Sequence, residues 1–211
     1  VLASHLGRPN GVDPSCSLQP VADRLTELTG WRVKLARSVV GDEVQAIAEG
    51  LAPGEILMLE NVRFEDGETK NDAELAAAYA ALADVYVNDA FGASHRAHAS
   101  NVGIVDQIEL SAAGLLLQRE VETISEILAD PPRPLVAIVG GSKVTDKIGV
   151  LNAFLERADV ILIGGAMCFP FFAAQGHQIG NSLCSDEDIE PARGVLAEAQ
   201  ERGTKLLLPT D

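Results

Sequence analysis

The sequence is poor in positive charge. It contains 16 Lys and Arg residues against 31 Asp and Glu residues, which gives a formal net charge of −15. A nucleic-acid-binding protein presents a basic stripe to the phosphate backbone, so this balance argues against a nucleic-acid partner. The same shortage makes any place where cations gather along the chain informative.

The sequence also lacks patterned cysteines and long apolar runs. Cys16, Cys168 and Cys184 are an odd number at wide spacing, with no CxxC or Cys/His zinc motif, which is typical of reduced cytosolic thiols. The longest apolar stretch, residues 160–174, is interrupted by Gly and Pro and is shorter than the roughly 20 residues of a membrane span. No signal peptide is recognisable. We therefore expect a cytoplasmic protein that has no membrane partner.

Short apolar or β-branched runs alternate with segments of helical period along the whole chain. Strands are predicted at 1–4, 32–35, 56–59, 85–88, 135–139, 160–163 and 205–208. Helices are predicted at 18–29, 42–49, 72–82, 113–128, 144–155 and 187–201, with a short one after Gly165. Ser17 is the expected N-cap of the first helix and Gly30 its stop, while Asn71 or Asp72 is expected to cap the third. This alternation predicts an α/β fold, with parallel sheets that carry helices on both faces.

Residues 113–134 are expected to divide the chain into two domains. Residues 113–128 form a long amphipathic segment, and the sequence Asp-Pro-Pro-Arg-Pro at 130–134 closes it, because proline cannot continue a helix. We predict an N-terminal domain at 1–112, a helix and linker at 113–134, and a C-terminal domain at 135–211.

Three arginines follow three predicted strands of the first domain. Arg8 lies in HLGRP after the first strand, Arg63 in ENVRF after the strand at 56–59, and Arg96 in DAFGASHRAH after the strand at 85–88. In open parallel sheets ligands bind outside the carboxyl ends of the strands, and guanidinium groups match the oxygens of carboxylates and phosphates. Each Arg taken singly fits a surface residue, and His5 and His98 fit structural histidines. As a set they predict an anion-binding site.

Two glycine-containing turns in the second domain lead from strands toward helices. The strand at 135–139 runs into GGSKVTDK, which contains Gly141, Lys143 and Lys147, and the strand at 160–163 runs into Gly164 and Gly165. Glycine lets a ligand approach the backbone, and a helix N-terminus favours negative charge. The sequence is not a P-loop, because GxxxxGK[ST] is absent. Since any strand-to-helix turn uses glycine, a nucleotide site and an ordinary turn both stay open here.

Taken together, these motifs resemble the phosphoglycerate kinase family. The matching stretches occur in family order and spacing: SHLGRPNG at 4–11, LENVRFEDGETKND at 59–72, VYVNDAFGASHRAHAS at 85–100, VGGSKVTDKIGV at 139–150 and, less closely, IGGAMCFPFFAAQG at 163–176. The resemblance covers essentially the whole chain.

The resemblance implies an α/β fold with two doubly wound, Rossmann-like parallel-sheet domains joined by a hinge helix. It also implies a monomeric, cytoplasmic enzyme of glycolysis and gluconeogenesis. The expected reaction is reversible phosphoryl transfer from 1,3-bisphosphoglycerate to ADP, giving 3-phosphoglycerate and ATP, with Mg²⁺ carried by ADP or ATP. The attacking group is a carboxylate in one direction and a phosphate oxygen of ADP in the other. Both are ionised at pH 7, so no general base is needed. Catalysis is expected from positioning and from stabilisation of the charge on the transferred phosphoryl group.

The resemblance assigns site residues position by position. On the phosphoglycerate side, the residues that look like the first binding loop and the other basic-patch arginines are His5, Leu6, Gly7, Arg8, Arg63 and Arg96. On the nucleotide side, the residues that look like base and phosphate contacts are Gly141, Gly165 and Lys147. Lys143 looks like the catalytic lysine that accompanies the phosphoryl group in transfer. No residue is assigned as a metal ligand.

The chain is expected to be an internal fragment in which both domains are truncated. The family's R-x-D-x-N-V-P segment would lie before Val1 and its GGGD[ST] loop after Asp211, so we expect these residues alone to bind phosphoglycerate weakly and not to turn over. Ala166 and Pro170 depart from the usual GGGMAFTF and bring the fit of the adenine pocket into question.

Two other functions stay open at this point. One is a dinucleotide-dependent α/β enzyme, against which the absence of a G-x-G-x-x-G turn counts. The other is a non-catalytic protein that binds a phosphate ligand.

Overall fold

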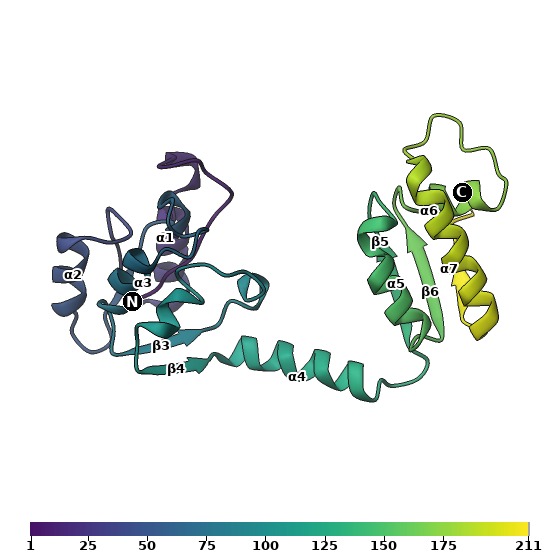
Figure 1. Cartoon of the computed structure of the whole chain (residues 1–211). Helices are drawn as coiled ribbons and strands as arrows, with labels where there is room; N and C mark the ends of the chain where they lie inside the picture. The colour runs from purple at the N-terminus through teal and green to yellow at the C-terminus, as the bar shows by residue number, and fades with distance from the viewer. Residues whose placement is uncertain (211) are drawn as a thin grey trace. The chain divides into compact units, whose positions relative to one another are not determined.

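The computed structural model describes residues 1–210 and has an α/β fold with small parallel sheets. The chain divides into two compact units, Val1–Ile124 and Ser125–Asp211, called here the N-terminal and C-terminal units. The division falls inside helix α4 (Leu115–Ala129), which continues from one unit into the other (Figure 1). Among the described residues, no helix combines the length and apolarity that crossing a bilayer requires.

The N-terminal unit contains two small parallel sheets. In the first, β1 (Val33–Leu35) pairs with β2 (Ile56–Met58). The predicted strand at 1–4 is reduced to a parallel bridge between Leu2 and Met58, in which the Leu2 amide donates to Leu57 and the Leu2 carbonyl accepts from Leu59. The segment that carries His5 therefore starts beside β2, as a parallel sheet requires.

The second sheet pairs β3 (Val85–Asn88) with β4 (Leu110–Ala113). The sequence did not predict β4, and the helix expected from residue 113 begins at Leu115 instead, because Ala113 is the last residue of the strand. The Asp89 carboxylate accepts hydrogen bonds from the first α4 amides, Leu116 at 2.7 Å and Leu117 at 3.0 Å. The end of β3 thus supports the start of α4.

Three helices pack on these strands, α1 (Gln19–Thr29), α2 (Asp42–Glu49) and α3 (Ala73–Ala80). The predicted cap of α3 is confirmed, since the Asp72 carboxylate accepts from the Leu75 amide at 2.9 Å. The predicted cap of α1 is wrong by one residue: Leu18 occupies the N-cap position, and Glu60 accepts from the Leu18 amide at 2.8 Å and from the Ser17 hydroxyl at 2.7 Å. The Ser17 hydroxyl still accepts from the Gln19 amide at 3.2 Å, so the carboxylate of Glu60 adds to the local cap and does not replace it.

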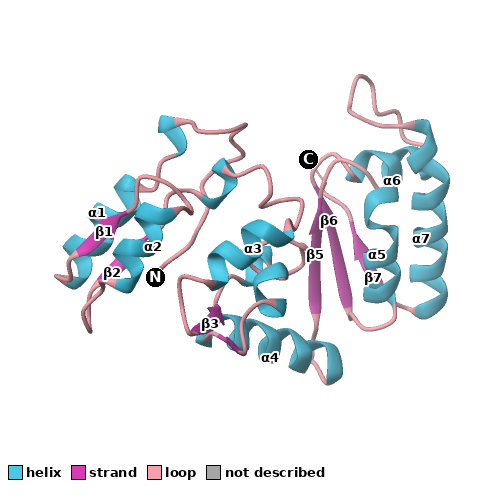
Figure 2. Ribbon diagram, turned by 60° about the vertical axis from the view of Figure 1, so that its left-hand side comes forward, coloured by secondary structure: helices cyan, strands magenta, loops and turns pink. Residues whose placement is uncertain are grey.

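The C-terminal unit is built on a single parallel sheet in the order β5 (Val136–Gly140), β6 (Val160–Gly164), β7 (Lys205–Leu207). Figure 2 shows α5 (Ile148–Leu155), α6 (Cys168–Ala174) and α7 (Ile189–Arg202) on the same side of this sheet. Alternate residues of β5 reflect this arrangement, because Val139 is buried whereas Ile138 is 80% exposed. The helices predicted from 144 and 187 both begin with a 3-10 turn, at Thr145–Lys147 and Asp186–Asp188.

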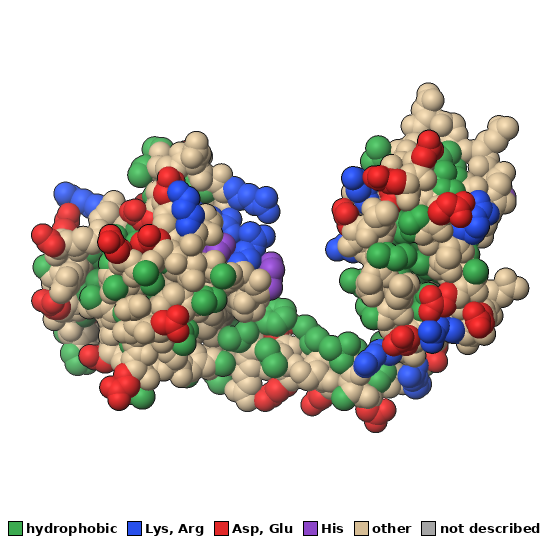
Figure 3. Space-filling model, in the orientation of Figure 1, with side chains coloured by type: hydrophobic (Ala, Val, Ile, Leu, Met, Phe, Trp, Pro, Cys, Tyr) green, Lys and Arg blue, Asp and Glu red, His purple; other side chains and the backbone are tan. Residues whose placement is uncertain are grey.

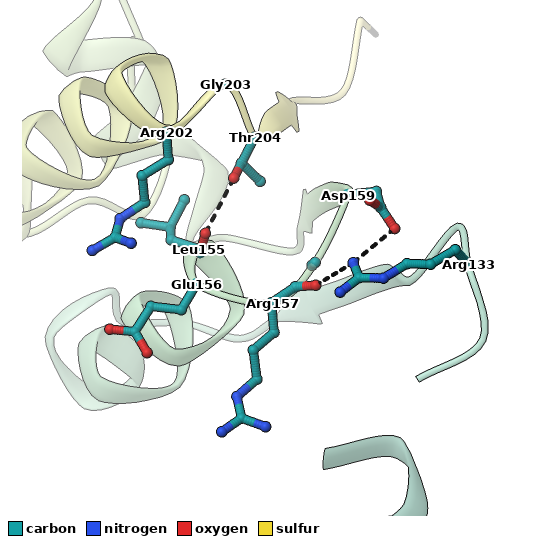
Figure 4. Close-up of a pocket in the computed structure, with 9 residues that line it drawn as sticks. Arg133, Leu155, Glu156, Arg157, Asp159, Arg202, Gly203 and Thr204 are labelled. Atoms are coloured by element: carbon teal, nitrogen blue, oxygen red, sulfur yellow. Dashed lines mark hydrogen bonds and ion pairs between the residues drawn. The ribbon is translucent and has the colours of Figure 1, made fainter. Parts of the chain in front are cut away.

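Arg133 fastens the segment after α4 to the C-terminal unit. Its guanidinium donates to the Arg157 carbonyl at 2.6 Å and to the Asp159 carboxylate at 3.0 Å, beside a pocket of 410 Å³ (Figure 4). The same carboxylate accepts from the Leu135 amide at 2.6 Å, and this bond, followed by the one from Arg133, lowers the pKa of Asp159. The entry into β5 is therefore anchored by side chains.

Candidate active site

The first cation-bearing loop has a fixed backbone. Gly7 adopts a φ of 65°, and a Cβ atom there would lie 3.1 Å from the Cys16 sulfur, so a side chain would be both strained and crowded. Asn61 is fully buried and donates from its amide nitrogen to the carbonyls of Leu6 at 2.8 Å and Cys16 at 2.9 Å. One side chain thus holds both ends of the loop that follows His5 and carries Arg8.

Arg63 joins the second predicted loop to the first. It lies in a 3-10 turn, Val62–Phe64, whose cap is Asn61, and the Asn61 oxygen accepts from the Arg63 amide at 3.1 Å. The Arg63 guanidinium donates to the Gly7 carbonyl at 2.6 Å. Partial loss of hydration lowers the pKa of Arg63, and the positive charges of Arg96 and Arg8 lower it further. Arg63 stays charged at any physiological pH.

The third loop carries Arg96 and leads back from the second sheet. After β3 it forms a 3-10 turn, Phe91–Ala93, and the Arg96 amide donates to the Ala93 carbonyl at 3.0 Å. The exposed Arg96 guanidinium lies 3.3 Å from His95. Loss of hydration lowers the pKa of His5, and the charges of Arg63, His98 and Arg96 add to this effect.

The three predicted arginines and His5 therefore lie within electrostatic reach of one another. Figure 3 shows Lys and Arg side chains beside His side chains along one side of the N-terminal unit. Among the ion pairs formed within residues 1–210, none involves Arg8, Arg63 or Arg96. Cations held together without carboxylate partners can bind an anion with several charge-assisted hydrogen bonds.

A buried carboxylate next to these loops was not predicted. Glu68 is 2% exposed and contacts Ser100, Tyr79 and His98, and all four residues line a cavity of 840 Å³ in the N-terminal unit. Burial and then the charge of Glu68 raise the pKa of Tyr79, so its hydroxyl stays a donor. No sequence signal separates Glu68 from the many exposed acidic residues of this chain, because its burial depends on contacts made after folding.

In the C-terminal unit, the two predicted glycine turns lie against each other. Gly140 and Gly164 are partners in the register of β5 and β6, which brings Gly141 and Gly165 together at the carboxyl ends of these strands. The Gly141 carbonyl accepts from the Met167 amide at 2.9 Å. Gly165 has a φ of 67°, and a Cβ atom there would lie 3.0 Å from the Gly141 oxygen. Bare backbone is therefore required where the two turns meet.

The lysines of the GGSKVTDK turn extend from a fixed backbone. Val144 is fully buried, and the Thr145 amide donates at 2.8 Å to the carboxylate of Asp188, which is 1% exposed. Lys147 is exposed at the start of α5, and the Lys143 ammonium lies 3.9 Å from the Glu187 carboxylate with both side chains largely exposed. Such a distant, hydrated pair is weak, so an anionic ligand can compete with Glu187 for Lys143.

The two departures from the family motif lie just before α6 and in its first turn. Pro170 is the third residue of α6, in the first turn, where amides have no acceptor within the helix. Its missing donor therefore costs α6 no intrahelical bond. Ala166 lies between Gly165 and the start of α6, and its carbonyl accepts from the Phe169 amide at 3.1 Å.

The roles that the sequence assigns to individual site residues stay predictions.

No group of three or more His, Cys, Asp or Glu side chains that could hold a metal ion is present within residues 1–210. The side chains gathered at the predicted sites of the two units are cations, which suit phosphate oxygens rather than a metal ion.

Comparison with known proteins agrees with the motifs. The family model for phosphoglycerate kinase matches residues 1–211. The chain is 50% identical over 211 residues to cytosolic phosphoglycerate kinase 3 of Arabidopsis thaliana and 49% identical over 212 residues to phosphoglycerate kinase of Fervidobacterium nodosum. Each match covers 100% of this chain and 53% of the relative, so the chain spans about half the length of the curated relatives it matches.

Solved structures lead to the same family. The chain is similar to the structure of phosphoglycerate kinase from Coxiella burnetii, with a TM-score of 0.79 and 41% identity over 98% of this chain and 52% of that one. The α/β architecture, the clustered arginines and the adjoining glycine turns are thus found in a chain whose whole length matches one family. The chain belongs to the phosphoglycerate kinase family.

Proposed function

We propose that the protein carrying this chain transfers a phosphoryl group reversibly between 1,3-bisphosphoglycerate and ADP, giving 3-phosphoglycerate and ATP. The observation that carries the proposal is the hydrogen bond from Arg63 to the Gly7 carbonyl, which joins two arginine-bearing loops without a neutralising carboxylate. A ligand with a carboxylate at one end and a phosphate at the other supplies the anions that this cluster lacks.

The N-terminal unit would hold the phosphoglycerate. His5, Arg8, Arg63 and Arg96 donate to its carboxylate and phosphate oxygens, and Leu6 and Gly7 supply the backbone of the loop. His5 with its lowered pKa is mostly neutral at pH 7, so the arginines carry most of the positive charge.

The C-terminal unit would hold the nucleotide. Gly141 and Gly165 present bare backbone to the flat base, Lys147 holds phosphate oxygens, and Lys143 balances the charge that develops on the transferred phosphoryl group. Mg²⁺ bound to ADP or ATP supplies further charge neutralisation. We propose that the helix and linker at 113–134 act as a hinge between a phosphoglycerate-binding domain at 1–112 and a nucleotide-binding domain at 135–211.

The remaining attributes follow the same proposal. Cytosolic forms are among the relatives, and others are chloroplastic. We propose a cytoplasmic, monomeric enzyme without nucleic-acid or membrane partners, in keeping with a net charge of −15.

The proposal is tested by comparing Arg96→Ala with Arg24→Ala in the protein that carries this chain. Arg24 is an exposed α1 residue paired with Glu27 at 2.7 Å, so its substitution makes the same chemical change outside the cluster. Removing one donor to a developing or bound charge typically costs about 10²- to 10³-fold, so we expect a loss of that order in kcat/KM with 3-phosphoglycerate for Arg96→Ala. Arg24→Ala should leave kcat/KM unchanged. Equal activity of the two variants in a coupled assay would reject the proposed role.

A further inference from the structure

We propose that Glu68 is a positioning residue, which fixes the loop carrying Arg96 and so sets the affinity for the phosphoglycerate substrate. Glu68 lies before α3, far along the sequence from this loop, and makes no contact with substrate in the proposed mechanism. The inference rests on the proposed function, because it takes Arg96 to bind that substrate.

Both carboxylate oxygens of Glu68 are occupied by one residue of the loop. One oxygen accepts from the Ser100 amide at 3.1 Å, and the other accepts from the Ser100 hydroxyl at 2.6 Å. The second oxygen also lies 3.5 Å from the His98 imidazole, and the Glu68 carbonyl accepts from the Ala99 amide at 2.9 Å. Three consecutive residues are thus attached to a single buried side chain and its backbone.

The attachment continues through Asn101 to Arg96. The Asn101 oxygen accepts from the His98 amide at 2.9 Å, and its amide group donates to the Ala93 carbonyl at 2.8 Å. The same Ala93 carbonyl accepts from the Arg96 amide at 3.0 Å. The backbone of Arg96 is therefore connected to Glu68 through these hydrogen bonds and the peptide bond between Ser100 and Asn101, although the Arg96 side chain itself is exposed.

This connection explains why a carboxylate is buried here. A buried charge is costly unless hydrogen bonds compensate it, and Glu68 receives them mostly from the loop. The contact with α3 is weaker, because the Tyr79 hydroxyl lies 3.4 Å from the carboxylate. Glutamine has the same shape, but its amide group would face the donors of Ser100 and could not accept from both. The charge and its two acceptors are what hold the loop.

The experiment compares Glu68→Gln with Tyr79→Phe in the protein that carries this chain. Tyr79→Phe removes a donor to the same carboxylate from the helix side and leaves the loop attached, so it controls for loss of stability alone. The readouts are the 3-phosphoglycerate dissociation constant by calorimetry, the KM for ATP, and the melting temperature. Because small displacements of positioning groups can cost up to about a hundredfold, we expect Glu68→Gln to weaken 3-phosphoglycerate binding about tenfold. The KM for ATP should not change, and Tyr79→Phe should leave both constants unchanged.

A second comparison separates positioning from general destabilisation. If Glu68 acts through Arg96, Glu68→Gln should weaken binding by less than about twofold when it is made in an Arg96→Ala background, since coupled residues are not additive. An undiminished tenfold effect in that background, or unchanged affinity in the single variant, overturns the inference. Should Glu68→Gln fail to fold, Ser100→Ala removes the hydroxyl contact alone, and we expect a loss of about threefold in affinity that depends on Arg96 in the same way.

Failure of the proposed function gives a different result. In that case the unsubstituted protein does not bind 3-phosphoglycerate, or Arg96→Ala binds it as tightly as the unsubstituted protein does. Tight binding that depends on Arg96 but not on Glu68 rejects the positioning role alone.

Discussion

The meeting of Gly141 and Gly165 gives the sharpest test of the nucleotide side. We predict that Gly165→Ala destabilises the protein and weakens ADP binding, whereas Gly176→Ala only destabilises it slightly. Both glycines have positive φ angles, 67° and 86°, so alanine is strained at either position. The difference lies in their surroundings, because a Cβ atom at Gly165 meets the Gly141 oxygen at 3.0 Å and its nitrogen at 3.2 Å, while one at Gly176 meets nothing within 4 Å.

The magnitudes follow from these contacts. A left-handed conformation costs an L-residue about 1–2 kcal/mol, which both variants lose. The crowding at Gly165 adds about 1–3 kcal/mol, because its neighbour is backbone and cannot rotate away. Each kcal/mol lowers the melting temperature of a domain of 150–250 residues by about 2–4 °C. We therefore expect Gly165→Ala to melt at least about 2 °C below Gly176→Ala.

Thermal unfolding and calorimetric titration with Mg-ADP measure the two effects. In Gly165→Ala the new Cβ atom pushes Gly141 away from its place at the end of β5. This displacement should weaken Mg-ADP binding about tenfold, a difference of about 1.4 kcal/mol in binding free energy. Gly176→Ala should bind Mg-ADP as the unsubstituted protein does. Equal melting temperatures for the two variants would show that crowding at Gly165 does not affect the free energy of unfolding. Unchanged ADP affinity in Gly165→Ala would show that these two turns do not contribute to nucleotide binding.

Two further predictions concern buried or clustered titratable groups. The folded-state pKa of His5 is lowered, so below the ordinary value of 6.5 the unfolded chain takes up the proton first and the folded state loses stability as pH falls. His5→Gln should therefore show a smaller drop in melting temperature between pH 7 and pH 5.5 than the unsubstituted protein, and an equal or larger drop would contradict this. Asp188→Ala leaves the Thr145 amide without its acceptor at 2.8 Å and should cost about 1–3 kcal/mol. Its melting temperature, compared with that of Asp186→Ala in the same 3-10 turn, measures this loss, and equal values for the two variants would count against it.

Most of the scaffold follows from periodicity, and the exceptions have physical causes. β4 was missed because the sequence Leu-Ser-Ala-Ala at 110–113 has no β-branched residue and all four residues are exposed, so no alternation of apolar and polar side chains marks the strand. The end of α1 was predicted correctly because Gly30, with its φ of 71°, is a local signal. Its start was off by one residue, because Glu60, from another part of the chain, binds the Ser17 hydroxyl and the Leu18 amide, and Leu18 occupies the N-cap position.

The same distinction applies to the candidate site. The positions of Arg63 beside the Gly7 loop and of Gly165 beside Gly141 follow from the rule that parallel strands end at one edge of a sheet. Glu68 and Asp188 could not be predicted in the same way. Acidic residues are usually exposed, and only the folded chain shows which ones are enclosed by hydrogen-bond donors from distant segments.

Asn61 has a consequence for which residues of the loop between Leu6 and Cys16 can be substituted. Its two donated hydrogen bonds end on main-chain carbonyls, those of Leu6 and Cys16, and neither depends on the side chains at these positions. Apart from Gly7, whose φ of 65° and closeness to the Cys16 sulfur exclude a side chain, side chains between these ends can therefore vary while the backbone keeps its shape. The shape of this loop thus depends on a residue 55 positions after Leu6. A single substitution of Asn61 would remove both hydrogen bonds that hold its ends.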